Sequence, residues 1–167
     1  MDLEKLNIDV GFMIEALKEA EAAKEADEVP IGCVIVAPQG GGKRNGVLHN
    51  GGKRNRGRII ARAHNLVQTL NDPTAHAEMQ AITSATAFLG GKYLTDCTIY
   101  VTVEPCPMCA AALNWAQIGR VVYGCTDPKR GAGLYSPNLY HPKTELSAGV
   151  LEAECAQLVK DFFKKKR

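Results

Sequence analysis

The chain has 167 residues, of which 46% are hydrophobic and 23% charged, and its formal net charge is +2. This composition is that of an ordinary globular protein, and it excludes a membrane-spanning helix because no apolar run is long enough to cross a bilayer. We therefore expect one domain over residues 1–167, located in the reducing cytoplasm, where the six cysteines remain free.

The first predicted element is a helix from about Asp9 to Ala26. Apolar side chains recur there at helical spacing, and acidic and lysine side chains occupy the opposite face. The apolar run Ile31–Val36 follows and is typical of a short buried strand.

Residues 38–58 interrupt this pattern with many glycines and cations. They contain an imperfect repeat, Gly41–Asn45 and Gly51–Asn55, and no acidic residue occurs between Glu28 and Asp72. We interpret the segment as an insertion between two strands. Its cations could bind a polyanion. Alternatively, the segment could be a solvent-exposed insertion without a function, since loops accept extra residues at small entropic cost.

Strands and helices alternate in the rest of the chain. A strand over Ile59–Asn65 is expected to be antiparallel to the first, because only a loop separates the two. The later predicted elements are a helix over 76–86, a strand over 98–103, a helix over 107–117, a strand over 120–125, a loop over 127–143, a strand near 145–146 and a helix from about 151. Strands separated by helices usually pair in parallel, so the sequence predicts an α/β fold with a mixed sheet covered on both faces.

Two cysteines stand where a predicted strand passes into a predicted helix. Pro105 and Pro107 suit the start of a helix, and Cys106 and Cys109 are three residues apart, which places both thiols on one helix face. The positive end of the helix dipole favours the thiolate form that a metal requires. The pair is therefore a candidate for two ligands of one ion.

A third ligand is offered by His76, at the start of the preceding helix, with Glu78 two residues further on. Three protein ligands and a water are typical of a catalytic zinc, and the combination H-x-E with a later P-C-x-x-C is the signature of zinc nucleobase deaminases. A redox-active cysteine pair or a structural zinc site are the alternatives for such spacing.

Several blocks of this sequence resemble the bacterial tRNA-specific adenosine deaminases, a branch of the cytidine-deaminase-like zinc superfamily. The resemblance covers nearly the whole chain, and the blocks that carry it are Glu28–Gly32, Asp72–Glu78, Tyr100–Cys109, Ile118–Gly124, Glu154–Ala156 and Asp161–Phe163. The zinc motif is common to the superfamily, and the flanking blocks favour the tRNA branch.

The resemblance implies a three-layer α/β/α fold with a mixed five-stranded sheet, and a homodimer with active sites near the subunit interface. It implies hydrolytic deamination of adenosine to inosine at the wobble position of a tRNA anticodon. One Zn²⁺ per chain would be held by His76, Cys106 and Cys109, and Glu78 would transfer protons.

The resemblance also implies contacts with the substrate. Asn65 would hydrogen-bond the flipped base, Asp127 lies in a loop that contacts RNA, and Ala77 and Pro105 flank the zinc ligands. The expected partner is a tRNA anticodon loop, and neither DNA nor a membrane is expected. The 38–58 insertion and a shorter loop after Gly131 depart from the family pattern.

The basic end of the chain is a further candidate for contact with RNA. Its cations would meet phosphates, although they also complement the negative end of the last helix dipole. They are Lys160, Lys164, Lys165, Lys166 and Arg167.

Two other functions remain possible from the sequence. A guanine deaminase, or a deaminase of another free nucleobase or nucleoside, would use the same zinc and glutamate. A non-catalytic, zinc-stabilised RNA-binding module would not need Glu78, because a structural metal site requires no proton shuttle.

Overall fold

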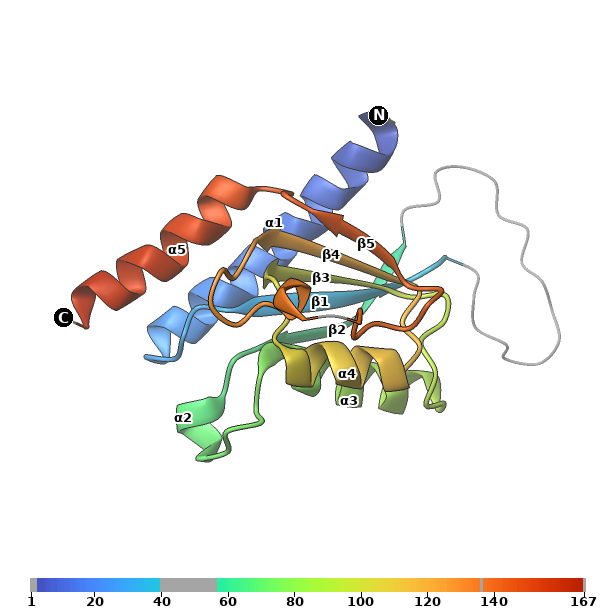
Figure 1. The fold of residues 1–167 in the computed structure, drawn as a ribbon, viewed down its shortest axis with the longest axis horizontal. Helices are drawn as coiled ribbons and strands as arrows, with labels where there is room; N and C mark the ends of the chain where they lie inside the picture. The colour runs from blue at the N-terminus through green and yellow to red at the C-terminus, as the bar shows by residue number, and fades with distance from the viewer. Residues whose placement is uncertain (1–2, 40–56, 136, 167) are drawn as a thin grey trace, which may run out of the picture.

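The computed structural model describes residues 3–39, 57–135 and 137–166, and these residues build a five-stranded sheet with helices on both faces (Figure 1). The strands are β1 (Gly32–Ala37), β2 (Arg58–His64), β3 (Thr98–Val103), β4 (Arg120–Cys125) and β5 (Glu145–Ala148). In space their order is β2-β1-β3-β4-β5. β1 is antiparallel to β2 and β3, whereas β3, β4 and β5 are parallel. The predicted mixed five-stranded sheet is confirmed.

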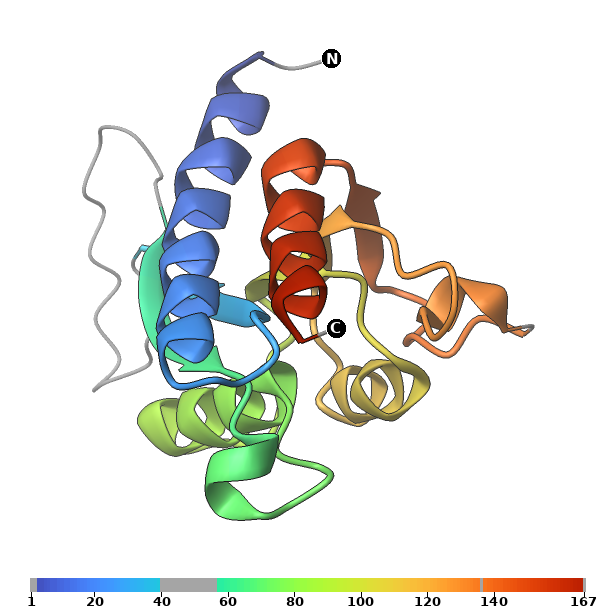
Figure 2. The same ribbon diagram turned by 90° about the vertical axis from the view of Figure 1, so that its left-hand side faces the viewer.

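Four helices form the outer layers. α1 (Leu3–Glu25) and α5 (Glu152–Lys165) lie side by side on one face, and α3 (Ala77–Leu89) and α4 (Pro107–Trp115) cover the other (Figure 2). Two single turns lie in the connections: α2 (Val67–Leu70) and the 3-10 helix η1 (Ala132–Leu134). The arrangement is the three-layer α/β/α fold expected from the sequence.

The central strands are mostly apolar because both of their faces are buried. Val34 and Tyr100 pack with Met13 of α1, on the face that α1 and α5 cover. Ile35 and Ile99 alternate with them and pack on the side of α3 and α4. A strand that is buried on both faces is rich in apolar residues. The bounds of β1 and β3 could therefore be predicted closely from the sequence.

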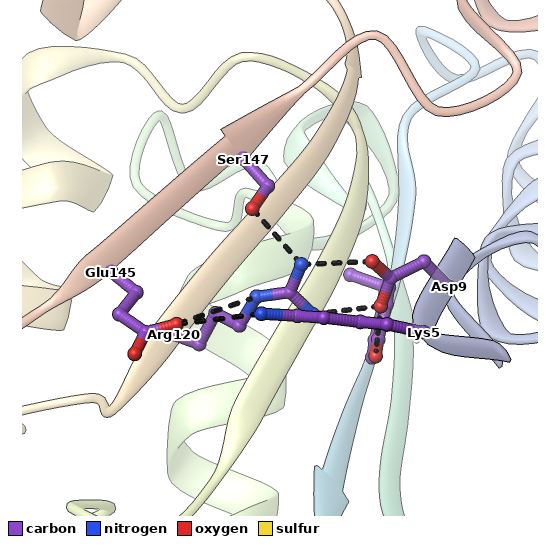
Figure 3. Close-up of polar contacts among 6 residues, drawn as sticks. Lys5, Asp9, Arg120, Glu145 and Ser147 are labelled. Atoms are coloured by element: carbon purple, nitrogen blue, oxygen red, sulfur yellow. Dashed lines mark hydrogen bonds and ion pairs between the residues drawn. The ribbon is translucent and has the colours of Figure 1, made fainter. Parts of the chain in front are cut away.

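The first helix begins earlier than predicted, at Leu3 rather than Asp9. Asp9 lies within α1 and is 5% exposed. Its carboxylate accepts two hydrogen bonds from Arg120, at 2.7 and 2.8 Å (Figure 3). It also accepts one from the Tyr100 hydroxyl at 2.8 Å. The aspartate is therefore the buried partner of an arginine from β4, and the helix continues through it.

The other differences from the predicted elements are small. The helix of the cysteine pair ends at Trp115 instead of 117, α3 extends to Leu89, and the turn α2 was not predicted. Most of the 38–58 insertion, residues 40–56, lies outside the described residues. Among the helices that the structure describes, none has the length and apolar character to cross a membrane.

The segments that connect the strands lie at two opposite edges of the sheet, where the strands begin and end. β3 and β4 end at one edge, which we call the carboxyl edge, and β1 starts there because Cys33 pairs with Val101. The connection from β1 to β2 is at the opposite edge, where Ala37 pairs with Arg58.

Candidate metal centre and active site

Two helix N-termini meet at the carboxyl edge and bring three metal-binding side chains together. His76 is the N-cap residue of α3, Cys106 is the N-cap residue of α4, and Cys109 lies one turn further along α4. Nδ1 of His76 is 3.6 Å from Sγ of Cys106 and 3.5 Å from Sγ of Cys109. Their ligand atoms all lie within 4.8 Å of one another, and among the described residues this is the one group of His, Cys, Asp and Glu side chains arranged to hold a metal ion.

These distances fit a tetrahedral zinc ion. Zinc lies about 2.3 Å from a cysteine sulfur and about 2.05 Å from a histidine nitrogen, so tetrahedral geometry separates S and N by about 3.6 Å. The two observed S–N distances are within 0.1 Å of that value. The donor set, two sulfurs and one imidazole nitrogen, leaves a fourth position for water or substrate, as in catalytic zinc sites.

The protonation of the two thiols also fits a divalent cation. The hydrogen bond from Cys109 lowers the pKa of the Cys106 thiol to about 4, and the bond with His76 adds to this effect while burial opposes it. The pKa of Cys109 is raised by its hydrogen bond to Cys106, by burial and by the negative charge of Glu78. A second thiolate in this position needs a nearby positive charge, which a bound metal ion supplies.

Glu78 lies in the first turn of α3, beside the three ligands, and is 3% exposed. Burial raises the pKa of its carboxyl group, and the negative charge of Cys106 acts in the same direction. A carboxylate that is buried next to a metal centre and has a raised affinity for protons is suited to general acid–base catalysis.

Asn65 directly follows β2 at the same edge of the sheet and is 6% exposed. Its Nδ2 donates to the Glu28 carboxylate at 3.0 Å, and the other Glu28 oxygen accepts from the backbone N–H of Thr69 at 2.6 Å. Burial acts to raise the pKa of Glu28, but the N–H groups of Thr69 and Gln68 outweigh it, so this pKa is below its ordinary value. The buried carboxylate thus holds the Asn65 amide in one orientation.

Asp127 follows β4 and shapes the next turn, because its Oδ1 accepts the backbone N–H groups of Lys129 at 2.9 Å and Arg130 at 3.0 Å. Pro105 is buried, and its carbonyl accepts the N–H of Ala132 at 2.9 Å. Ala77 is fully buried in the core. The structure therefore brings all eight predicted site residues to the carboxyl edge.

Comparison with known proteins agrees with this geometry. The family model described as "Cytidine and deoxycytidylate deaminase zinc-binding region" matches residues 6–125 of this chain. The chain belongs to this zinc-binding deaminase family. It is similar to the tRNA-specific adenosine deaminase of Agrobacterium fabrum, with 41% identity over 93% of this chain and 94% of the relative. The resemblance to the tRNA-specific branch is confirmed.

Solved structures of this deaminase family agree with both the fold and the branch. A structure from a study of A-to-I editing by tRNA:A34 deaminases is 40% identical, has a TM-score of 0.73, and covers 89% of this chain and 98% of its own. A guanine deaminase from Bacillus subtilis is 37% identical with a TM-score of 0.55, and the match covers 70% of this chain and 63% of that one. The similarity to the guanine deaminase is thus less extensive. The cofactor of this zinc-binding deaminase domain is zinc.

Sequence reasoning on this deaminase gave no role to Glu28, Glu104 or Arg130. Glu104 directly follows β3, so an acidic residue at the end of a mostly apolar strand is the available signal for it, whereas Glu28 lies in the turn before β1. Arg130 is exposed, and its positive charge affects the pKa of the zinc ligand His76. The pKa of His76 is raised chiefly by its hydrogen bond with Cys106, whereas burial and the charge of Arg130 lower it.

Proposed function

We propose that this chain is a zinc-dependent tRNA adenosine deaminase that converts adenosine to inosine at the wobble position of an anticodon. The observation that carries the proposal is the Cys₂His cluster with the buried Glu78 beside it. Hydrolytic deamination needs a metal with an open position and a carboxylate within reach of the substrate. The tRNA substrate is supported by the names of the relatives at about 40% identity.

In this proposal His76, Cys106 and Cys109 hold the ion, and Glu78 moves the protons. Zinc, when bound, lowers the pKa of water to about 7 and so supplies a nucleophile at neutral pH. Glu78 would accept one proton from water and deliver it to N1 of adenine as the water oxygen bonds to C6. It would then take the remaining proton from the new C6 hydroxyl and pass it to the amino nitrogen as the C6–N bond breaks and ammonia leaves. A proton-transfer role of this kind contributes roughly 10²–10⁴-fold in rate.

The residues around the metal centre suit a base taken out of a single-stranded loop. Extruding a base costs a few kcal/mol, and least where it is already unpaired, as in an anticodon loop. We assign recognition of the extruded base to Asn65, whose amide is fixed by Glu28. We also assign Asp127, Ala77 and Pro105 to the substrate site, as the family resemblance implies.

Exposed cations supply the charge that RNA phosphates require. Lys129 and Arg130 lie in the turn after β4. Lys160, Lys164 and Lys165 are exposed on α5, whose carboxyl-terminal end points toward the carboxyl edge (Figure 1).

We further propose that residues 1–167 form one deaminase domain that acts in the cytoplasm as a homodimer. Exposed apolar side chains support the dimer: Trp115 at the carboxyl-terminal end of α4 is 85% exposed, and Leu134 of η1 is 59% exposed. Side chains of this kind are enriched at subunit interfaces. Analytical ultracentrifugation of the zinc-loaded protein tests the dimer, and a monomer at micromolar concentration would contradict it.

The decisive experiment measures inosine formation in an anticodon stem-loop RNA by wild type and by Glu78→Gln. The amide keeps the shape of the carboxylate but cannot accept the water proton. We expect activity to fall at least 10²-fold, while zinc content and RNA affinity stay close to wild type. Glu21→Gln, on the exposed face of α1, is the matched control. Activity of Glu78→Gln within tenfold of wild type would exclude this residue as the proton shuttle.

Free guanine, cytidine and adenosine are assayed in parallel with the RNA. A tRNA deaminase should release ammonia from the RNA far faster than from any of these small molecules. If the chain is instead a guanine deaminase, it should release ammonia from free guanine faster than from the RNA.

A further inference from the structure

The turn after β4 is tied directly to the segment that carries the zinc-binding cysteines. Oε2 of Glu104 accepts the backbone N–H of Asp127 at 3.0 Å, and Oε1 accepts the N–H of Gly133 at 2.8 Å. Pro105 adds a third bond through its carbonyl, which accepts the N–H of Ala132. One carboxylate, two residues before Cys106, thus holds both ends of the turn.

Two glycines of the turn lie so close to the Glu104 carboxylate that a side chain at either position would collide with it. A Cβ atom on Gly131 would lie 2.2 Å from Oε2 of Glu104, and a Cβ atom on Gly133 would lie 2.8 Å from Oε1. Glycine permits such an approach because it has no side chain. The enclosed group must accept hydrogen bonds at both oxygens, so glutamine, whose amide nitrogen is a donor, does not replace it.

The same turn carries two exposed cations, Lys129 and Arg130, and the charge of Arg130 acts on the zinc ligand His76. The N–H groups of Lys129 and Arg130 are bound by the Asp127 carboxylate, and the N–H of Asp127 is bound by Glu104. The positions of both cations therefore depend on Glu104 through a short chain of hydrogen bonds. Because Glu104 is two residues before Cys106, the backbone that carries both cations is fixed relative to the zinc ligands.

We propose that Glu104 is a positioning residue for RNA: it holds Lys129 and Arg130 where the phosphates next to the extruded nucleotide pass. The inference rests on the proposed tRNA deaminase function. A charge-assisted hydrogen bond to a backbone N–H is stronger than a neutral one, so the carboxylate keeps the turn in place before the RNA arrives. This preorganisation lowers the cost of binding.

The test separates positioning from a merely structural role by a double-mutant cycle. Glu104→Gln, the pair Lys129→Ala/Arg130→Ala, and the triple variant are compared with wild type on an anticodon stem-loop RNA. We expect Glu104→Gln to raise KM about tenfold, the effect of losing one hydrogen bond to a charged group. Zinc content and kcat should stay within about twofold of wild type, since no zinc ligand is changed.

The coupling between the substitutions is the critical readout. If Glu104 acts through the two cations, the triple variant binds RNA no more weakly than Lys129→Ala/Arg130→Ala. Glu104→Gln should also flatten the slope of log affinity against log salt, by up to about 1.4 for two contacts at about 0.7 each. Additive losses of affinity, an unchanged salt slope, or loss of zinc in Glu104→Gln would overturn the proposal.

Gly133→Ala provides an independent perturbation in case Glu104→Gln does not fold. It displaces the turn from the same carboxylate while leaving Glu104 in place, and it should reproduce the higher KM and the flatter salt slope. RNA affinity equal to wild type in Gly133→Ala would also overturn the proposal. A wild-type protein that binds the RNA without forming inosine would instead contradict the proposed function, so the two failures are distinguishable.

Discussion

Replacing Asp9 with alanine should be among the most destabilising single changes in this protein. Asp9 and the Arg120 side chain are 5% and 12% exposed, and two short hydrogen bonds join them (Figure 3). Asp9→Ala leaves the arginine charge buried without its main partner and removes the acceptor of the Tyr100 hydroxyl. Breaking a buried ion pair in this way costs roughly 3–5 kcal/mol, a large part of the 5–15 kcal/mol typical of a domain.

The loss should be large because the network has little capacity to rearrange. Nε of Arg120 already lacks a hydrogen-bond partner among the described residues. The remaining acceptors near the guanidinium are the Ser147 hydroxyl at 2.9 Å and the Glu145 carboxylate at 4.0 Å, whose side chain is 69% exposed. Neither can replace a bidentate carboxylate.

Urea unfolding at a fixed free zinc concentration measures the effect. The double variant Asp9→Leu/Arg120→Leu should recover most of the stability, because apolar residues often replace a buried ion pair without loss. Glu145→Gln is the exposed control and should cost less than about 1 kcal/mol. Zinc content should be unchanged in all variants, since the network lies at the edge opposite the metal centre. A cost below about 1 kcal/mol for Asp9→Ala, or additive losses in the double variant, would refute this reasoning.

Three further predictions concern the metal, a buried acid and the insertion. Cys106→Ala should lower zinc from one ion per chain to a small fraction, measured by mass spectrometry of the metal, and should lower Tm because metal binding is linked to folding; undiminished zinc would contradict the ligand assignment. Glu28→Gln should cost roughly 1–3 kcal/mol near neutral pH through the weakened bonds to Asn65 and Thr69. Because the folded pKa of Glu28 is below its ordinary value of 4.5, this stabilisation is present above pH 4.5 and is lost as the pH falls through the folded pKa; a cost that does not shrink in acid, in unfolding experiments at several pH values, would contradict it. Deleting Gly40–Gly57 should weaken RNA binding modestly and flatten the salt slope by less than about 3.5, the value for five contacts, with little change in kcat; an unchanged slope would identify a passive insertion.

The metal centre could be predicted from the sequence because its signals are local. The spacing of Cys106 and Cys109 places both sulfurs on one helix face, and His76 starts a helix of its own. The central strands were also predictable, since burial on both faces makes β3 and β4 rich in apolar and β-branched residues. In each case a few neighbouring residues contain the information.

The interactions that were missed join residues far apart in the chain. Asp9 looked like the start of a helix, and its partner Arg120 is 111 positions away. The bond from Asn65 to Glu28 spans 37 positions, and that from Gly133 to Glu104 spans 29. A pattern in one segment does not specify which distant group will neutralise a buried charge. The turn α2 is too short to give a periodic signal.

The place where the insertion joins the sheet has a practical consequence for engineering. Gln39 and Gly57 follow and precede strand residues that pair at the edge opposite the metal centre. One strand of six residues, about 20 Å, separates that edge from the zinc ligands. A fluorophore, an affinity handle or a fused targeting domain attached at Gln39 or at Gly57 would leave the zinc ligands and Glu78 unobstructed. One attached group can thus be exchanged for another at these positions without changing the residues of the metal centre.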